Sequence, residues 1–227
     1  MAPIDLTDLD AVTQHLHHRL AEALPGLEAH LVMSPRPRAG WQPAHVPEGS
    51  RAAAALLLLY PHRGEVHLLL TVRASSLPHH SGQVSLPGGA VEAGEAIETA
   101  ALREAAEEVG LDPGGVEVVG QLSPLHIPVS GFVLNPVVAV SRERPATRPA
   151  AHEVARIVEV PLTHLADPLA LRLRLRMHDG RAYEVPYFAV DGEQLWGATA
   201  MVVGELLWVL GHLPRLAPGR EGPRQNS

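Results

Sequence analysis

The stretch LPGGAVEAGEAIETAALREAAEEVGL, residues 86–111, carries the most informative pattern in the chain. Pro87, Gly88 and Gly89 predict a strand end followed by a tight turn, because glycine adopts backbone dihedrals that other residues avoid. Residues 96–109 consist mainly of Ala, Glu, Leu and Arg and contain no Gly or Pro, which predicts a helix. Gly110 is expected to end that helix. The stretch therefore predicts a strand, a loop and a helix in succession.

Three glutamates gather on one face of the expected helix. Glu104 and Glu108 are one turn apart, and Glu107 lies three residues after Glu104. Carboxylates at these spacings repel one another. A bound cation would relieve the repulsion, and carboxylate oxygens are preferred ligands of hard divalent ions such as Mg²⁺. The alternative is a solvated acidic face, which is the usual explanation of a charge run.

The composition bounds the class of protein. The 227 residues include 46% hydrophobic residues and no cysteine, so we expect one domain with a substantial core and no disulfide or thiolate site. The formal net charge of −7 does not favour a nucleic-acid-binding protein. The first residues, MAPIDLTDLD, do not resemble a signal peptide, and the longest apolar run, residues 52–60, is too short to cross a bilayer. We therefore expect a cytoplasmic protein without a membrane partner.

The succession of expected strands and two main helices predicts an α/β/α sandwich in one domain. An amphipathic helix is expected at residues 5–24, an irregular Pro-rich segment at 25–50, and a buried helix at 198–210. Strands are expected at residues 51–60, 65–72, 116–122, 133–140, 155–160, 171–177 and 183–190. In the strand LRLRLRM, residues 171–177, we expect the arginines to form a solvated face, with phosphate binding as the less favoured alternative. These elements divide the chain into an N-terminal segment (1–50), a main domain (51–212) and a disordered tail (213–227).

The fixed positions of residues 89–111 resemble the Nudix box. The matching residues are Gly89, Glu95, Arg103, Glu104, Ala105, Glu107, Glu108, Gly110 and Leu111. Within the Nudix hydrolases, the chain is similar to the coenzyme A pyrophosphatase branch over residues 52–210. The similarity rests on LLTVRASSLPHHSGQVSLPGG (69–89), HIPVSGFVLNPVV, EVARIVEVPL, YEVPYFAV and LWGATAMVVGELL. Two positions depart from the branch motif, where Pro78 replaces an arginine and Leu86 replaces a phenylalanine.

The resemblance implies a Nudix-type α/β/α sandwich with a mixed sheet. It also implies an enzyme that hydrolyses a nucleoside diphosphate derivative with Mg²⁺ or Mn²⁺. It assigns the metal to the carboxylates of Glu104, Glu107 and Glu108 and to the backbone carbonyl of Gly88. Arg103 is expected to orient the box together with Glu95. Glu107 is our first choice for the general base, and Glu153 is the second.

The expected substrate is coenzyme A or a derivative, with 4′-phosphopantetheine and adenosine 3′,5′-bisphosphate as products. Arg73 and Gly82 of the branch motif are expected at the substrate, and His79 and His80 are candidate phosphate donors in place of the missing arginine. Arg51, Arg63 and Arg73 are candidates for the pocket of the 3′-phosphate. The alternatives are a Nudix hydrolase for ADP-ribose, NADH or another nucleoside diphosphate derivative, and a non-catalytic nucleotide-binding module. The sequence leaves the oligomeric state and the number of metals open.

Overall fold

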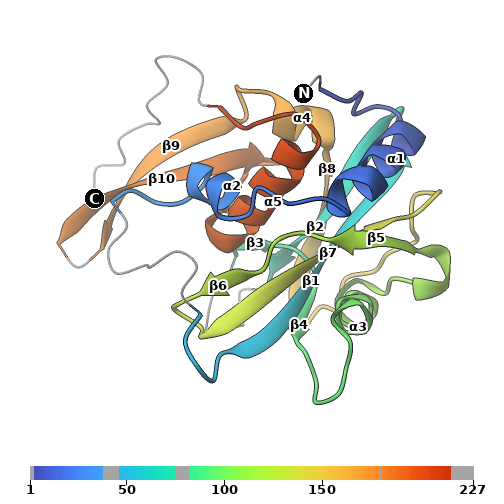
Figure 1. The fold of residues 1–227 in the computed structure, drawn as a ribbon, viewed down its shortest axis with the longest axis horizontal. Coiled ribbons are helices and arrows are strands. Elements are labelled where there is room, and N and C mark those ends of the chain that lie inside the picture. The colour runs from blue at the N-terminus through green and yellow to red at the C-terminus, as the bar shows by residue number, and fades with distance from the viewer. Residues whose placement is uncertain (1–2, 38–45, 75–81, 179, 216–227) are drawn as a thin grey trace.

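The computed structural model describes residues 3–37, 46–74, 82–178 and 180–215, and its ribbon is drawn in Figure 1. The helices of these residues are α1 (Leu9–Leu20), α2 (Leu27–Val32), α3 (Ile97–Val109), α4 (Leu162–Ala166) and α5 (Gly197–Val209), with a 3₁₀ turn at Pro113–Gly115. The first strands are β1 (Arg51–His62), β2 (Glu65–Arg73), β3 (Val84–Ser85), β4 (Gly88–Ala90), β5 (Glu117–Gln121) and β6 (Leu125–Ile127). They are followed by β7 (Phe132–Val140), β8 (Val154–Pro161), β9 (Leu171–His178), β10 (Arg181–Val190) and β11 (Glu193–Trp196).

The larger sheet is mixed and forks beside β1. Strand β1 runs parallel to β7 along one edge, and on its other edge it pairs antiparallel with β2. The pairing with β2 covers only Leu59 to His62, after which β2 continues between β8 and β3. The short strand β4 occupies the place beside β1 that β2 leaves, and β5 and β6 pair with β7. Strands β9, β10 and β11 form a second, antiparallel sheet.

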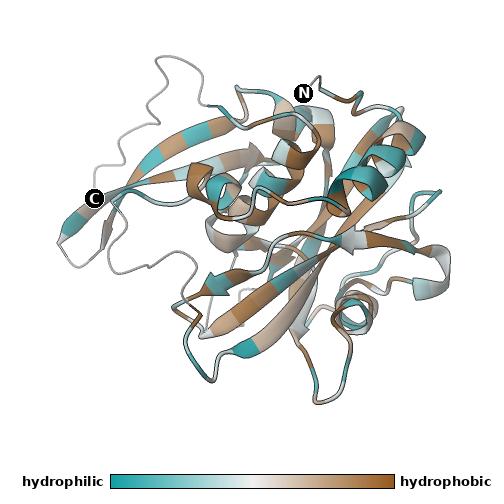
Figure 2. Cartoon of the chain, in the orientation of Figure 1, coloured by the Kyte–Doolittle hydropathy of each residue, from teal (hydrophilic) through white to brown (hydrophobic). Residues whose placement is uncertain are grey.

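Helices cover both faces of the larger sheet, so the predicted α/β/α sandwich with a mixed sheet is confirmed (Figure 1). One core lies between α3 and the face of β1 that carries Ala54, Leu56, Leu58 and Tyr60. The alternate residues of β1 enter the other core, to which α1 and α5 contribute. Both sets are apolar, as expected for a central strand that is buried on both faces. Figure 2 shows the same contrast, with apolar residues dominating α5 and the central strands.

The first helix is shorter than residues 5–24, although the flanking leucines are buried as the pattern implied. Asp8 caps the helix by accepting hydrogen bonds from the amides of Asp10 and Ala11. Leu6 lies before this cap, where its side chain enters the core and its carbonyl accepts from the Val66 amide at 3.2 Å. The apolar pattern therefore extends beyond the helix, because loop residues such as Leu6 also pack in the core.

The segment expected to be irregular contains helix α2, which packs against α5. Glu205 of α5 is fully buried, and its carboxylate lies 3.0 Å from the Gly26 amide and 2.9 Å from Nε2 of His30. The same carboxylate accepts from the Ser123 amide at 3.2 Å. Helices of this length are unstable alone, so these long-range contacts stabilise α2. Local composition did not reveal them.

Several short elements were also missed, namely α4 and strands β3, β4, β6 and β11. Each has five residues or fewer, which is too short for a clear period. Residues 216–227 of the expected tail lie outside the described residues. No helix in the described ranges is long and apolar enough to cross a membrane.

An ion pair joins the loop after β7 to Glu159 of β8, which also contacts β1. Arg144 donates to both carboxylate oxygens of Glu159, at 2.8 and 2.7 Å, and the Tyr60 hydroxyl donates to the same carboxylate at 2.7 Å. The hydrogen bonds from Arg144 and, to a lesser extent, from Tyr60 lower the pKa of Glu159 to about 2 against the effect of burial. We call this group the Glu159 cluster.

Candidate active site

Strand β4 lies directly on β1 and directs its free polar groups towards α3. The Leu56 amide donates to Pro87 at 2.9 Å, and the Val91 amide donates to Ala52 at 3.0 Å. Antiparallel pairing alternates along the strand, so Gly88 and Ala90 turn their amides and carbonyls away from β1. Two contacts agree with this geometry, because the Ala90 carbonyl accepts from Arg103 at 3.1 Å and the Gly88 amide bonds to Glu108.

Gly88 and Gly89 leave no room for a side chain, because β1 lies close to one of them and Glu104 of α3 lies close to the other. A Cβ atom on Gly88 would lie 2.3 Å from the Ala54 carbonyl oxygen, which is backbone and cannot move aside. A Cβ atom on Gly89 would lie 2.5 Å from the carboxyl carbon of Glu104. The prediction of a tight turn at Gly88 and Gly89 is wrong, because both glycines belong to strand β4 and neither has a positive φ. Their small size instead lets β4 lie flat between β1 and the acidic face of α3.

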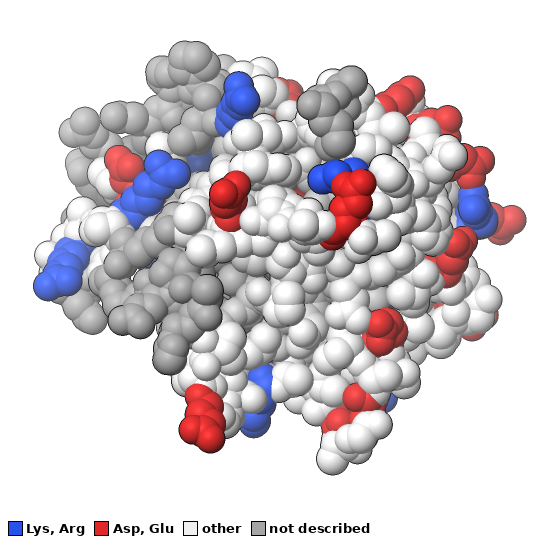
Figure 3. Space-filling model, viewed as in Figure 1, with Lys and Arg blue, Asp and Glu red and all other residues white. Residues whose placement is uncertain are grey.

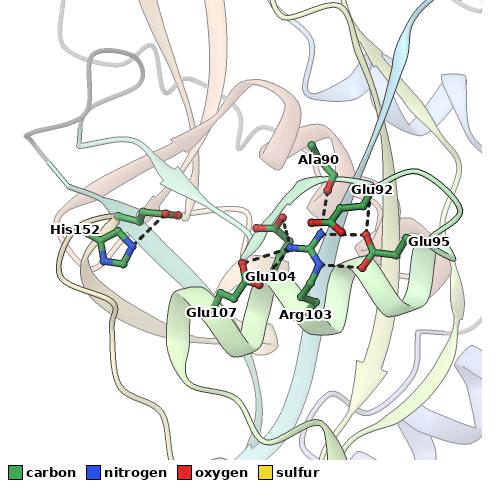
Figure 4. Close-up of polar contacts among 8 residues, drawn as sticks. Ala90, Glu92, Glu95, Arg103, Glu104, Glu107 and His152 are labelled. Carbon is green, nitrogen blue, oxygen red and sulfur yellow. Dashed lines mark hydrogen bonds and ion pairs between the residues drawn. The ribbon is translucent and has the colours of Figure 1, made fainter.

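Arg103 is the centre of the hydrogen-bond network in Figure 4, between Glu95 on one side and Glu104 and Glu107 on the other. Its Nε and Nη2 donate to the two oxygens of Glu95 at 2.9 and 3.1 Å, which is a forked pair. Its Nη1 donates to Glu104 at 2.9 Å and, with a longer contact of 3.4 Å, to Glu107. The hydrogen bond from Arg103 lowers the pKa of Glu95, and the partners raise that of Arg103. The predicted pairing of Arg103 with Glu95 is thus present in the structure, and its orienting role stays a prediction.

Glu108 is the buried carboxylate of the site, with 4% of its surface exposed. Burial raises its pKa to about 7, because desolvation disfavours the charged form. Arg73 and the Gly88 amide oppose this shift, whereas the charges of Glu153 and Glu104 add to it. The structure therefore brings five of the predicted site residues into one electrostatic neighbourhood.

The two candidates for the general base differ in setting. Glu107 has 61% of its side chain exposed, and its long contacts to Arg103 leave the carboxylate accessible. Glu153 has 42% exposed, lies 3.3 Å from His152, and enters the site from the turn before β8. Figure 4 shows His152 at the other end of the site from Glu95. Both carboxylates lie near the box, and neither is committed to a strong ion pair with an arginine.

The remaining predicted substrate residues are dispersed. The Arg73 carbonyl accepts from the Gly82 amide at 3.1 Å, so these two residues are neighbours. His79, His80 and Pro78 lie outside the described residues, and Leu86 packs in the core away from the substrate side.

Two arginines named for the 3′-phosphate lie at opposite ends of β1. Arg51 stacks on Phe132 at 4.2 Å. Arg63 lies in the turn between β1 and β2, eight residues beyond the Ala55 position that pairs with Gly88, or about 26 Å along an extended strand. Of the three arginines, the structure places Arg73 at Glu108.

A cavity beside the site contains residues that the sequence analysis did not select. It has a volume of about 290 Å³ and is lined by Gly82, Gln83, Arg174, Glu193, Gln194 and Trp196. The expectation of a solvated arginine face on β9 is wrong for Arg174, which is partly buried and stacks on Trp196 at 4.8 Å. Alternation revealed which face the arginines share, but it did not reveal that an aromatic side chain covers that face.

The profile of the NUDIX domain family matches residues 49–182. This chain belongs to the Nudix family. It is 38% identical over 169 residues to the protein of Enterobacter sp. (strain 638) named uncharacterized Nudix hydrolase NudL, covering 73% of this chain and 86% of the relative. The NudL protein of Cronobacter sakazakii is 39% identical over 167 residues, with 71% and 84% covered. Among solved structures, the Nudix hydrolase RenU of M. smegmatis has a TM-score of 0.48 at 26% identity, covering 74% of this chain and 90% of that chain.

As a Nudix hydrolase of the pyrophosphatase kind, the protein is an enzyme, which sets aside the non-catalytic alternative. Nudix hydrolases generally use divalent metals such as Mg²⁺ or Mn²⁺ and bind small nucleotide-derived substrates. The predicted reaction class and the general type of cofactor agree with this membership.

The residues of the site fit a divalent cation by their chemistry. In the described ranges, no three His, Asp or Glu side chains already converge as a complete ligand set. However, Glu104 and Glu108 flank β4, and the Gly88 carbonyl faces away from β1, so two carboxylates and a backbone oxygen are available together. Oxygen donors of this kind suit Mg²⁺, which completes its shell with waters and substrate phosphates. A cation here would also stabilise the buried Glu108 in its charged form.

Proposed function

We propose that this Nudix hydrolase cleaves the diphosphate of coenzyme A or its derivatives, giving 4′-phosphopantetheine or its acyl form and adenosine 3′,5′-bisphosphate. The observation that carries the proposal is the position of Arg73. This arginine belongs to the branch motif upstream of the box, and its charge acts directly on Glu108. The motif that favours coenzyme A and the box that supports hydrolysis therefore meet at one place.

The proposed roles follow from the charges and contacts of the site. Glu104, Glu108 and the Gly88 carbonyl would hold the metal, with Glu107 as a further ligand or as the base. When bound, the metal supplies neutralisation of the diphosphate charge and acidification of water. Arg103, held by Glu95, fixes the position of Glu104 and so acts as a positioning residue. Arg73 provides a fixed positive charge for the anionic substrate.

The test compares coenzyme A, acetyl-coenzyme A, ADP-ribose and NADH as substrates of the purified protein with Mg²⁺ or Mn²⁺. Products are separated by chromatography, and Glu108→Gln serves as the inactive control. We expect coenzyme A or its acyl form to have the highest kcat/KM and to give adenosine 3′,5′-bisphosphate. Faster cleavage of ADP-ribose or NADH would refute the assignment to coenzyme A while leaving the Nudix chemistry intact.

The choice of base is tested by comparing Glu107→Gln with Glu153→Gln. Loss of a general base lowers kcat by roughly 10²- to 10⁴-fold. If Glu107 is the base, its variant keeps this loss at saturating metal, whereas Glu153→Gln retains most of the rate. Recovery of Glu107→Gln at high metal concentration would assign that residue to metal binding alone, and a loss confined to Glu153→Gln would make Glu153 the base.

A further inference from the structure

Two neighbouring cations of the second sheet lie at the cavity formed with Gly82 and Gln83, where Arg174 lines the cavity and Arg176 is exposed. Arg174 and Arg176 lie two residues apart on one face of β9, and each guanidinium carbon lies 4.8 Å from the ring centre of Trp196. The two positive charges repel each other. Burial, and to a lesser extent the charge of Arg176, lowers the pKa of Arg174. Trp196 offsets part of this cost through cation–π attraction.

Carboxylates do not neutralise this pair. Within the described ranges, neither Arg174 nor Arg176 forms an ion pair with an Asp or Glu side chain. Glu193 lines the same cavity, but it accepts from Arg156 at 3.0 Å, and Asp191 also bonds to Arg156. Figure 3 shows the wider distribution on the face it displays, where basic side chains are prominent near β9 and β10 and acidic ones predominate on the side of α1 and β5.

The hydrogen-bonding capacity of Arg174 is also unfilled. One of its terminal nitrogens donates to the Gln194 side chain, whereas its buried Nε has no hydrogen-bond partner among the residues that the structure describes. Buried donors without a partner are rare and costly. An anion with several oxygens would satisfy a planar guanidinium and neutralise the adjacent charges, and phosphate fits this geometry best.

The cavity is connected to the box through the backbone. Gln83 accepts from the Arg73 amide at 3.1 Å, and Gly82 donates to the Arg73 carbonyl, so the cavity wall adjoins the arginine that acts on Glu108. Gln83 and Gly88 are five residues apart, which limits their separation to about 17 Å. An extended nucleotide conjugate that places its diphosphate at Glu104 and Glu108 can therefore direct a second anionic group towards β9.

We propose that Arg174 and Arg176, stacked on Trp196, bind a non-reacting phosphate monoester on the nucleoside part of the substrate, as found at the 3′ position of coenzyme A. This inference deepens the proposed function and rests on it for the identity of the substrate. It replaces Arg51 and Arg63 as candidates for the 3′-phosphate. The subsite would select substrates with the extra phosphate over ADP-ribose and NADH, which carry none there.

Calorimetric titration separates binding at this subsite from the reaction. The probes are adenosine 3′,5′-bisphosphate and AMP, each titrated into the protein with Mg²⁺ present, and the variants are Arg174→Gln and Arg176→Gln. Arg172→Gln is the matched control, because Arg172 lies on the same face of β9, is exposed, and does not stack on Trp196. Circular dichroism checks that each variant is folded, and the exposed Arg176 provides a variant less prone to disturb packing than Arg174.

We expect the wild type to bind the bisphosphate roughly 10- to 100-fold more tightly than AMP, as expected for charged hydrogen bonds to one phosphate. Arg174→Gln and Arg176→Gln should remove most of this preference, and Arg172→Gln should keep it. Equal affinities in the wild type, or an equal loss in Arg172→Gln, would overturn the proposal.

Steady-state kinetics add a second readout that separates the two proposals. The preference in kcat/KM for coenzyme A over its 3′-dephospho form should fall in Arg176→Gln through a higher KM with kcat retained. If the wild type cleaves neither compound but does cleave ADP-ribose, the proposed function fails. The titration still tests the subsite, because it measures whether the bisphosphate binds more tightly than AMP and whether Arg174→Gln and Arg176→Gln remove that preference.

Discussion

Replacing Glu205 with alanine would remove a fully buried carboxylate that joins α5 to α2 and to the segment before β6. Truncation leaves the Gly26 and Ser123 amides and the His30 imidazole without their shared partner, and His30 is itself only 3% exposed. Removing one partner of a buried ion pair lowers the free energy of unfolding by about 3–5 kcal/mol. Glu205→Gln keeps one carbonyl oxygen for the amides, so we expect a loss of about 1–3 kcal/mol.

Urea unfolding, followed by tryptophan fluorescence and by circular dichroism, measures these losses. With a slope of about 2 kcal/mol per molar urea, a loss of about 4 kcal/mol lowers the midpoint by about 2 M. Glu22→Ala is the control, because Glu22 pairs with Arg19 and His18 on the exposed side of α1 and should cost less than about 1 kcal/mol. The reasoning is refuted if Glu205→Ala shifts the midpoint no more than Glu22→Ala at an unchanged slope.

Four further outcomes are expected. Gly89→Ala should fold yet lose at least about 10-fold in kcat/KM, because its Cβ displaces Glu104. Gly115→Ala is the control, since its Cβ meets no atom within 4 Å and the variant should keep full activity. Equal activities of the two variants would contradict this reasoning. Arg103→Lys should lower kcat by about 10-fold or more with a smaller change in KM, since lysine cannot form the forked pair with Glu95 while it also donates to Glu104; an unchanged kcat would exclude a positioning role. The depressed pKa of Glu159 means that its cluster stabilises the fold above about pH 4.5 and loses that contribution as the pH falls towards 2. The free energies of unfolding of wild type and Glu159→Gln, measured with urea, should differ by about 1 kcal/mol or less at pH 7, because solvent screens the partner arginine. The difference should vanish towards pH 2, and parallel pH profiles would argue against it. Chelation of divalent metals should abolish hydrolysis, with recovery on adding Mg²⁺ or Mn²⁺; activity that persists in excess chelator would contradict a metal requirement.

The sequence predicted the elements whose signals are local and long. The run of residues 96–109 without Gly or Pro predicted α3 nearly to the residue, and Gly110 ends it in the left-handed conformation at φ 64°. The apolar runs of β1, β2 and β7 were recognised because strands buried on both faces are continuously hydrophobic. Regular period and composition were sufficient for these elements.

The features that escaped prediction depend on contacts between distant parts of the chain. Helix α2 owes its stability to Glu205, which lies 175 residues after His30, and no local pattern encodes that contact. The box singled out Glu104 and Glu108, which α3 carries on one face and which lie beside β4 in the structure, and their role as metal ligands stays a prediction. The environment of Arg174 depended on a tryptophan from another strand, which spacing within β9 does not reveal.

The fork of the larger sheet has a consequence for how such an enzyme diversifies. The backbone of β4 is held against β1 by main-chain pairing and by two glycines, so the hydrolytic residues keep their places whatever side chains change at a distance. The second sheet, from β9 to β11, supplies its own side chains to the neighbouring cavity. Under the proposed function, substitutions in β9 to β11 would therefore change which substrate is accepted without moving the backbone of β4 against β1.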